Sequence, residues 1–207
     1  MKKKLLKKFS FAVALIIGIL SSQIFAQSET YTVVPGDSMW KIAVKYQIGL
    51  SELIAQNPQI KNPSLIYPGQ KLTIPNIDAV KTQENEVIRL VNIERSKAGL
   101  QPLKANWELS RIARYKSQDM ATKNYFSHTS PTYGSPFDMI KAFGLSYRAA
   151  GENIAAGQTS PQSVMNAWMN SSGHRQNILS PNYTEIGVGL AKNSSGKYYW
   201  TQLFRKP

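Results

Sequence analysis

The sequence predicts an α+β protein built from two units of unequal size. Residues 30–75 show a strand signal, two helical stretches and a closing strand. Residues 84–207 show four helical stretches followed by two strands that a turn joins. Apolar residues recur with a period near 3.6 in the helical stretches and near 2 in the strands. The 207 residues leave room for both units, and composition alone indicates only a mixture of helix and strand.

The first 26 residues are typical of a secretory signal peptide. Lysines between Lys2 and Lys8 precede the apolar run 11–20, and small residues lead to Ala26, after which we expect cleavage. The apolar run is too short to span a bilayer comfortably, although an uncleaved anchor is the alternative. We therefore expect an exported chain without a stable membrane span after cleavage.

Charge and cysteine content narrow the function classes. The formal net charge of +13 falls to +8 without residues 1–26, which hold five lysines and no acidic residue. A basic exported protein suits an anionic wall or membrane surface. Lys and Arg are dispersed rather than clustered, so we expect no nucleic-acid partner. With no cysteine, the chain has no disulfide, thiolate metal site, catalytic cysteine or lipid-bearing cysteine.

Turn and helix signals predict the elements of the first unit, residues 30–75. A strand at 31–34 leads into a turn in which Asp37 or Ser38 can cap a helix. That helix carries an apolar stripe that we expect in the core, including Trp40. A second helix starts at Ser51 and ends before Pro58, and a strand at 71–75 closes the unit.

The stretches Y-T-V-V-P-G-D-S-M-W-K-I-A (31–43) and Y-P-G-Q-K-L-T-I-P (67–75) resemble a LysM module. The resemblance implies a partner made of N-acetylglucosamine, such as peptidoglycan or chitin. It places the glycan between two loops, formed by Gly36, Asp37, Ser38 and Met39 and by Asn57, Pro58, Gln59 and Ile60. Backbone amides and a carboxamide suit N-acetyl groups, and apolar side chains suit the sugar face. For Met39 and Ile60 the alternative is an ordinary core position. A single copy predicts modest affinity, and residues 76–83 read as a short polar linker.

The larger unit, 84–207, also follows local signals. Its first helix ends at Gly99, its second is capped by Asn106, its third begins at Pro136 and its fourth at Pro161. Two strands, 184–191 and 197–204, are joined by the turn 193–196. Within the first of these strands, I-G-V-G-L (186–190) indicates a buried strand that another backbone approaches closely.

The only two histidines bracket a carboxylate. His128 lies in Y-F-S-H-T-S-P, Glu152 and Asn153 lie in the A-G-E-N-I-A stretch that we expect to be a turn, and His174 lies in a second expected turn. A titratable group held between a helix and a core strand is a good candidate for a functional site.

Four stretches in one order resemble the CAP superfamily of cysteine-rich secretory, antigen 5 and pathogenesis-related proteins, in a cysteine-free bacterial form. They are G-E-N-I-A, W-M-N-S-S-G-H-R-Q-N-I-L, E-I-G-V-G and Y-W-T-Q-L-F. The resemblance implies an α-β-α sandwich for 84–207. It also implies a cleft in which two histidines and acidic residues meet, sometimes around a divalent metal.

By that resemblance, His128, Glu152 and His174 are the candidate catalytic or metal-binding residues. Two imidazoles and a carboxylate are reasonable ligands for Zn²⁺ or another divalent metal, with a fourth position left open. Ser127 could orient His128, and Asn153 could support the ligands. The family's second glutamate, after the tryptophan of the fourth helix, is missing here, and the next acid is Glu185. Without that carboxylate a hydrolytic mechanism has no obvious second acid or base.

Several functions stay open at this point. The three residues could instead be a buried hydrogen-bonded cluster that locks loops onto the sheet. The missing second glutamate favours a binding protein over an enzyme. The sequence also has no G-x-S-x-G elbow and no H-E-x-x-H motif of a zincin protease. We expect a secreted protein, held at the cell wall by peptidoglycan, whose CAP unit binds an unknown ligand. The alternatives are a metal-dependent wall hydrolase or protease, a lipid-binding protein, and a spore coat or envelope assembly protein.

Overall fold

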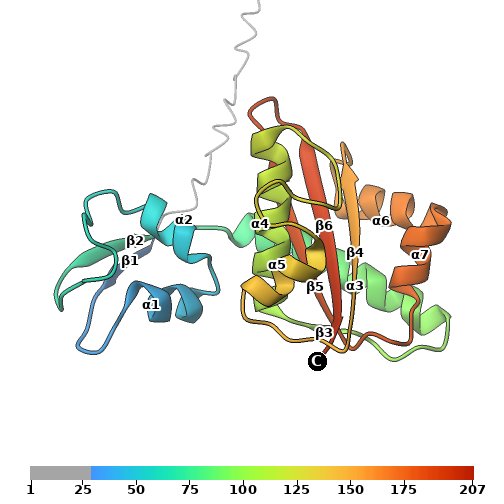
Figure 1. Cartoon of the computed structure of the whole chain (residues 1–207), viewed down its shortest axis with the longest axis horizontal. Helices are drawn as coiled ribbons and strands as arrows, with labels where there is room; N and C mark the ends of the chain where they lie inside the picture. Colours follow the sequence, from blue (N-terminus) through green and yellow to red (C-terminus); the bar gives the residue numbers. More distant parts are fainter. Residues whose placement is uncertain (1–28) are drawn as a thin grey trace, which may run out of the picture.

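The computed structural model describes residues 29–207, which form a small and a larger unit (Figure 1). The signal peptide expected at 1–26 lies outside the described residues. Within residues 29–207, no helix combines the length and the apolar character needed to cross a bilayer.

The small unit has the predicted order of strand, helix, helix and strand. Strands β1 (Glu29–Thr32) and β2 (Lys71–Ile74) pair antiparallel, and helices α1 (Met39–Tyr46) and α2 (Leu50–Ala55) lie between them in the chain. Ser38 caps α1 by accepting a hydrogen bond from the backbone N–H of Lys41. The core of this unit consists of Val33, Met39, Ile42, Ala43, Ile48, Leu53, Leu72 and Ile74.

Trp40 lies outside this core, so the expectation that it is buried was wrong. Its side chain is 44% exposed, whereas Met39, Ile42 and Ala43 are buried. Successive residues of a helix are about 100° apart, and the buried stripe runs through positions 39, 42, 43 and 46. Trp40 therefore points away from the core of the small unit and faces Arg111 of the larger unit.

The larger unit is built on a four-stranded sheet in the order β3-β5-β6-β4. Its strands are β3 (Lys104–Ala105), β4 (Ala149–Ala156), β5 (Glu185–Lys192) and β6 (Tyr198–Lys206). Strand β6 pairs antiparallel with both β4 and β5, and β3 runs parallel to β5. The predicted turn 193–196 joins β5 to β6, with Asn193 accepting the backbone N–H of Lys197.

Helices cover both faces of this sheet, which confirms the predicted α-β-α sandwich (Figure 1). One layer contains α3 (Asp78–Lys97), α6 (Pro161–Asn170) and α7 (Ser172–Ile178), and the other contains α4 (Trp107–Lys123) and α5 (Pro136–Ala142). The first layer packs on large side chains of the central strands, among them Val188 and Trp200. The second packs on Leu203 and on the glycine face of β5.

Helix α4 approaches β5 at backbone distance, as the I-G-V-G-L stretch predicts. A Cβ atom on Gly189 would lie 2.0 Å from the backbone N of Arg114, and one on Gly187 would lie 2.3 Å from the carbonyl carbon of Leu109. Only glycine leaves room for this approach. The alternation in β5 therefore places its large side chains under α3 and its glycines under α4.

The helix starts also follow the sequence signals. Asn106 caps α4 by accepting the N–H of Leu109, and Ser135 and Ser160 form capping boxes just before Pro136 and Pro161.

The structure of residues 76–83 differs from the short polar linker that the sequence predicts. Helix α3 already begins at Asp78, so most of 76–83 is helical. The reason is that these residues continue the apolar stripe of α3 backwards through Val80, which packs against the core.

Candidate functional site

Glu152 and Asn153 lie in strand β4, at the free edge of the sheet, and not in the turn expected from the flanking glycine. Glu152 is opposite Leu203 of β6, and Asn153 is opposite Gln202. Gly151 serves close packing, because a Cβ there would lie 2.5 Å from the Tyr183 hydroxyl. Neighbouring strand residues point to opposite faces, so Glu152 faces the α4 layer and Asn153 the α7 layer.

The Glu152 carboxylate forms an ion pair with His128. Its Oε1 lies 2.7 Å from Nδ1 of the imidazole; the Glu152 side chain is almost fully buried, whereas that of His128 is 56% exposed. The hydrogen bond that His128 donates to the Glu152 carboxylate raises the pKa of His128, because a carboxylate favours the imidazolium form. The second carboxylate oxygen, Oε2, is buried without a hydrogen-bond partner within residues 29–207.

Lys116 is a further member of this group that the sequence reasoning missed. The side chain is buried on α4, and its ammonium donates a 2.7 Å hydrogen bond to the backbone carbonyl of His128. Burial lowers the pKa of Lys116, and the Glu152 carboxylate opposes this shift. A signal was present in the sequence, because Lys116 lies on the buried stripe that runs through Leu109, Ile112 and Met120.

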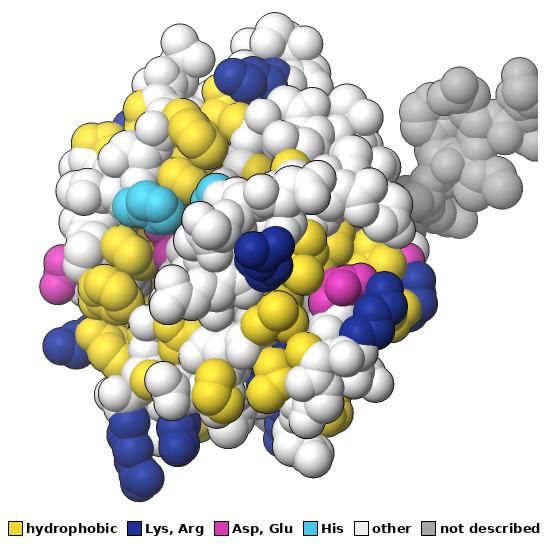
Figure 2. Space-filling view, turned by 90° about the vertical axis from the view of Figure 1, so that its right-hand side faces the viewer, with side chains coloured by type: hydrophobic (Ala, Val, Ile, Leu, Met, Phe, Trp, Pro, Cys, Tyr) yellow, Lys and Arg dark blue, Asp and Glu magenta, His cyan; other side chains and the backbone are white. Residues whose placement is uncertain are grey.

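His174 lies on α7, not in a tight turn. The Asn153 side chain donates to the backbone carbonyl of His174 at 3.0 Å, and Asn177 donates to Asn153 at 2.9 Å, so polar contacts tie α7 to β4. Burial, and then the nearby charge of His128, lower the pKa of His174. The two imidazoles lie near one another on the face shown in Figure 2, seen from the side of α6 and α7.

Ser127 and Glu185 each have partners outside the group formed by His128 and Glu152. The Ser127 hydroxyl accepts the backbone N–H of Thr129 at 3.2 Å, and Glu152 is the side chain that fixes the His128 ring. Glu185, the next acid after the missing second glutamate, forms a 2.6 Å ion pair with Arg205 and accepts a hydrogen bond from Asn106. The partners of Glu185 are distant in sequence, whereas Thr129 is only two residues from Ser127.

Within residues 29–207 the three candidate residues are not grouped as ligands of one metal ion, and a metal at this place stays a prediction. In the part of the chain that the structure describes, no three His, Cys, Asp or Glu side chains are grouped so that they could hold a metal ion. One oxygen of Glu152 is taken by His128, and a carboxylate bound to an imidazole nitrogen orients that ring rather than acting as a third ligand. As placed, these residues suit recognition of a polar group through the exposed side of His128.

Glu152→Gln should lower the pKa of His128, because a carboxamide stabilises the imidazolium less than a carboxylate does. The pKa of His174, set mainly by burial, should change much less. Since only two histidines are present, NMR titration of the imidazole protons resolves both. Glu86→Gln, which removes an exposed acid paired with Arg89, is the control.

The raised pKa of His128 also determines the direction of a small effect of pH on the stability of the fold. The pKa of His128 is raised above 6.5, so the native state binds the proton more tightly than the unfolded chain does. The stabilisation by the His128–Glu152 pair is therefore complete below pH 6.5, and it is lost as the pH rises through the pKa of His128 in the folded protein. An unchanged His128 titration in Glu152→Gln would contradict the pairing.

The residues expected to bind glycan divide into structural and exposed ones. Met39 and Asn57 are buried, and Asn57 bonds to backbone groups of Leu53 and Thr73. Asp37 accepts hydrogen bonds from the N–H of Val34 and from the Tyr31 hydroxyl, which lower its pKa in that order of size, and Ser38 caps α1. Gly36, Pro58 and Gln59 are exposed, and Ile60 is partly buried against the core. The two loops thus precede α1 and follow α2, with the exposed residues available to a ligand.

Comparison with known proteins gives two matches. Residues 31–75 match the LysM domain, and residues 88–204 match CAP, the cysteine-rich secretory protein family. The uncharacterized protein YkwD of Bacillus subtilis is 59% identical over 126 residues, which cover 61% of this chain and 48% of that protein. The uncharacterized membrane protein YlbC of the same organism is 37% identical over 125 residues, which cover 60% and 35% of the two chains.

A solved structure agrees with these matches. An extracellular protein of Bacillus anthracis that contains an SCP domain superposes with a TM-score of 0.59 at 30% identity, covering 75% of this chain and 49% of that one. The chain thus spans half or less of the length of these relatives. The CAP match covers more than half of the chain and coincides with the α-β-α sandwich. The chain therefore belongs to the cysteine-rich secretory protein family, CAP, and carries a LysM domain before its CAP domain.

Proposed function

We propose that this protein is exported, binds peptidoglycan through its LysM domain, and thereby holds its CAP domain at the cell wall. The observation that carries the proposal is the LysM match over residues 31–75, in a unit with the strand-helix-helix-strand order. Gly36, Pro58 and Gln59 are exposed and can contact N-acetylated sugars, although the Gln59 carboxamide also donates a 3.0 Å hydrogen bond to Asn57. The basic chain also suits an anionic wall.

The CAP domain, in this proposal, binds a ligand in the envelope rather than catalysing a reaction. His128 offers its exposed ring edge, while Glu152 and Lys116 below it are buried and hold it in place. Such an arrangement recognises a hydrogen-bonding group on a ligand and lacks a second carboxylate to act as acid or base. The hydrolase, lipid-binding and spore-coat alternatives stay predictions.

The wall-binding part is tested with the double variant Pro58→Glu, Gln59→Glu. Two bulky charged side chains in the exposed loop should weaken binding about tenfold or more, because they displace a sugar that contacts this loop. The measurements are co-sedimentation with purified peptidoglycan and calorimetry with an uncharged N-acetylglucosamine oligomer.

The control adds the same charge elsewhere. Ser194→Glu, Ser195→Glu places two carboxylates in the β5–β6 turn, far along the chain from the LysM loops. It should reduce sedimentation only slightly and leave oligomer binding unchanged. If the loop variant and this control bind the oligomer equally well, the assignment of the LysM loops is refuted.

A further inference from the structure

A groove lies between the LysM helices and helix α4 of the CAP domain. Tyr115 of α4 donates a 2.8 Å hydrogen bond to Glu52 and accepts one of 2.9 Å from Ser51. Cavities of about 410 Å³ and about 520 Å³ lie beside this contact, and Ser51, Tyr115 and Tyr133 line both. We call the two together the interdomain groove. Each volume lies within the range of small-molecule sites.

The first part of the interdomain groove surrounds Arg111 with aromatic rings. The guanidinium carbon lies 5.1 Å from the ring centre of Trp40 and 5.4 Å from that of Phe143, and Trp107 and Tyr115 lie within 6 Å. Arg111 is 5% exposed. Its Nε has no hydrogen-bond partner, and it forms no ion pair with an acid, within residues 29–207.

A buried cation without a counter-charge is unfavourable, and aromatic faces offset only part of that cost. This environment lacks an anion. The rings around Arg111 come from both domains, because Trp40 belongs to α1 and Phe143 follows α5. An acidic group that entered here would therefore contact the LysM and CAP domains at once.

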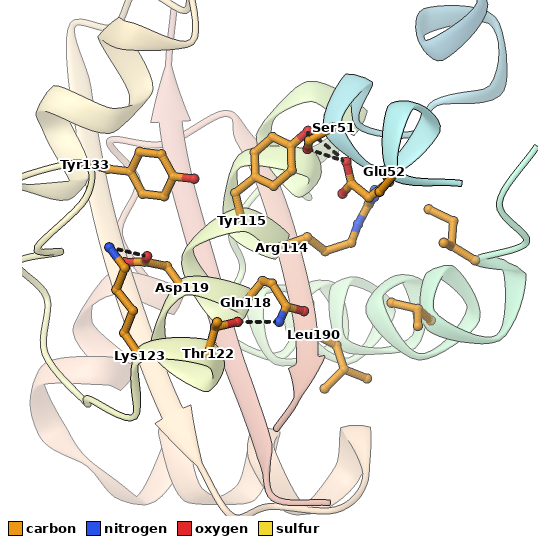
Figure 3. A pocket seen from close by; sticks show the side chains of 13 residues that line it. Ser51, Glu52, Arg114, Tyr115, Gln118, Asp119, Thr122, Lys123, Tyr133 and Leu190 are labelled. Atoms are coloured by element: carbon orange, nitrogen blue, oxygen red, sulfur yellow. Dashed lines mark hydrogen bonds and ion pairs between the residues drawn. The ribbon is translucent and has the colours of Figure 1, made fainter. Parts of the chain in front are cut away.

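The second part of the interdomain groove is more polar (Figure 3). Arg114 bonds to Glu84 through Nε at 3.2 Å, but its buried Nη1 has no hydrogen-bond partner among the described residues. Gln118 and Thr122 bond to each other at 2.8 Å on the exposed side of α4. These groups offer hydrogen bonds to hydroxyl or acetamido groups of a ligand.

The ligand must match an aromatic surface, one unpaired buried cation and neutral polar groups. A pyranose ring has an apolar face of C–H groups and a polar rim, so it fits an exposed indole such as that of Trp40. The carboxylates of Glu52 and Asp119 also line the groove and disfavour a polyanion. A glycan with occasional carboxylates meets all three requirements.

We propose that the interdomain groove binds an N-acetylated glycan that carries carboxylates, the chemistry of peptide-free N-acetylmuramic acid in the wall polymer, with Trp40 against a sugar face and Arg111 paired with a carboxylate. The inference rests on the proposed function and extends it, because the wall polymer then contacts the CAP domain and α1 as well as the LysM loops. Binding in the interdomain groove holds both domains on one glycan chain.

The test uses the full chain and two matched probes. One is a tetrasaccharide of alternating N-acetylglucosamine and N-acetylmuramic acid, and the other is its carboxyl methyl ester. Wild type should bind the acid about tenfold more tightly than the ester by calorimetry, because a charge-assisted hydrogen bond is lost in the ester. Arg111→Gln should abolish this preference, and Trp40→Ala should weaken binding of the acid about tenfold.

The controls are Arg89→Gln and Ile93→Ala, which change an exposed arginine and an exposed apolar residue of α3 outside the groove. Both should keep wild-type affinities, and thermal unfolding verifies that every variant is folded. Equal affinity of wild type for acid and ester overturns the proposal, as does a preference that survives in Arg111→Gln. The proposal is also overturned if Arg111→Gln and Trp40→Ala change only the oligomeric state of the protein in solution and not its glycan affinity. In that case a second copy of the chain occupies the groove.

Failure of this inference is distinguishable from failure of the proposed function. If the uncharged N-acetylglucosamine oligomer binds through the Pro58 and Gln59 loop but acid and ester bind alike, the wall-binding function stands and the groove proposal falls. If the oligomer does not bind at all while the Arg111-dependent preference is present, the LysM loop assignment falls and the groove remains.

Discussion

Gly189→Ala is expected to lower the free energy of unfolding of the CAP domain by about 3 kcal/mol or more. The added Cβ would lie 2.0 Å from the backbone N of Arg114 and 2.1 Å from the carbonyl carbon of Ala113. These are backbone atoms in the middle of α4, so no side chain can rotate away and the whole helix must move. Such a shift would also disturb the 3.0 Å hydrogen bond from Ser117 to the carbonyl of Gly189.

Chemical denaturation followed by circular dichroism measures this effect. The matched control is Gly173→Ala in α7, where an added Cβ meets no atom within 4 Å and the backbone needs no positive φ. That variant should be neutral or more stable by up to about 1 kcal/mol, because alanine favours helix. A Gly189→Ala protein as stable as wild type would show that α4 and β5 are not in backbone contact.

Asn57→Ala is expected to destabilise the LysM domain by about 3 kcal/mol, because buried backbone groups would lose their partners. The carboxamide donates to the carbonyls of Leu53 and Thr73 at 2.7 and 2.8 Å, and accepts the N–H of Thr73 at 2.8 Å. It thereby joins the end of α2 to β2. In a unit this small, such a loss is a large share of the total stability.

Hydrogen exchange of the Thr73 amide reports this loss locally, and calorimetry with the N-acetylglucosamine oligomer reports glycan contact. The control, Asn62→Ala, removes an exposed carboxamide that caps only a turn and should change stability by less than about 1 kcal/mol. At a temperature where Asn57→Ala is still folded, its glycan affinity should equal that of wild type. A clear loss of affinity there would give Asn57 a direct role in binding glycan.

The stability and pH predictions concern different levels of the fold. Gly189 and Asn57 act on how elements pack, whereas Glu152 acts on the protonation of a single exposed ring. Of the groove variants, Trp40→Ala changes an exposed side chain outside the LysM core, whereas Arg111→Gln changes a buried one, so its folding is verified separately. Their separate readouts let wall binding, ligand recognition and folding be assessed independently.

Local chemistry determined the elements of this protein. Capping residues such as Asn106, and prolines such as Pro136 and Pro161, fixed where helices begin, because these signals act within one turn of the chain. Alternation in I-G-V-G-L determined a strand with one bulky face and one bare face, since the period of a strand is two residues. The order of elements in the LysM domain followed from the sequence, whereas strands β3 and β4 and helix α7 were not predicted, and the sandwich was implied by the resemblance to the CAP superfamily.

Only the tertiary structure decided which side chains meet. His128 and Glu152 are 24 residues apart, and their pairing depends on how the loop before α5 lies over the edge strand β4. Glu185 became the partner of Arg205 because neighbouring strands place them opposite each other. Trp40 lies outside the LysM core, contrary to the prediction, because its position on α1 faces the CAP domain. A sequence pattern gives the faces of an element, whereas the partner that covers each face is set by packing between distant segments.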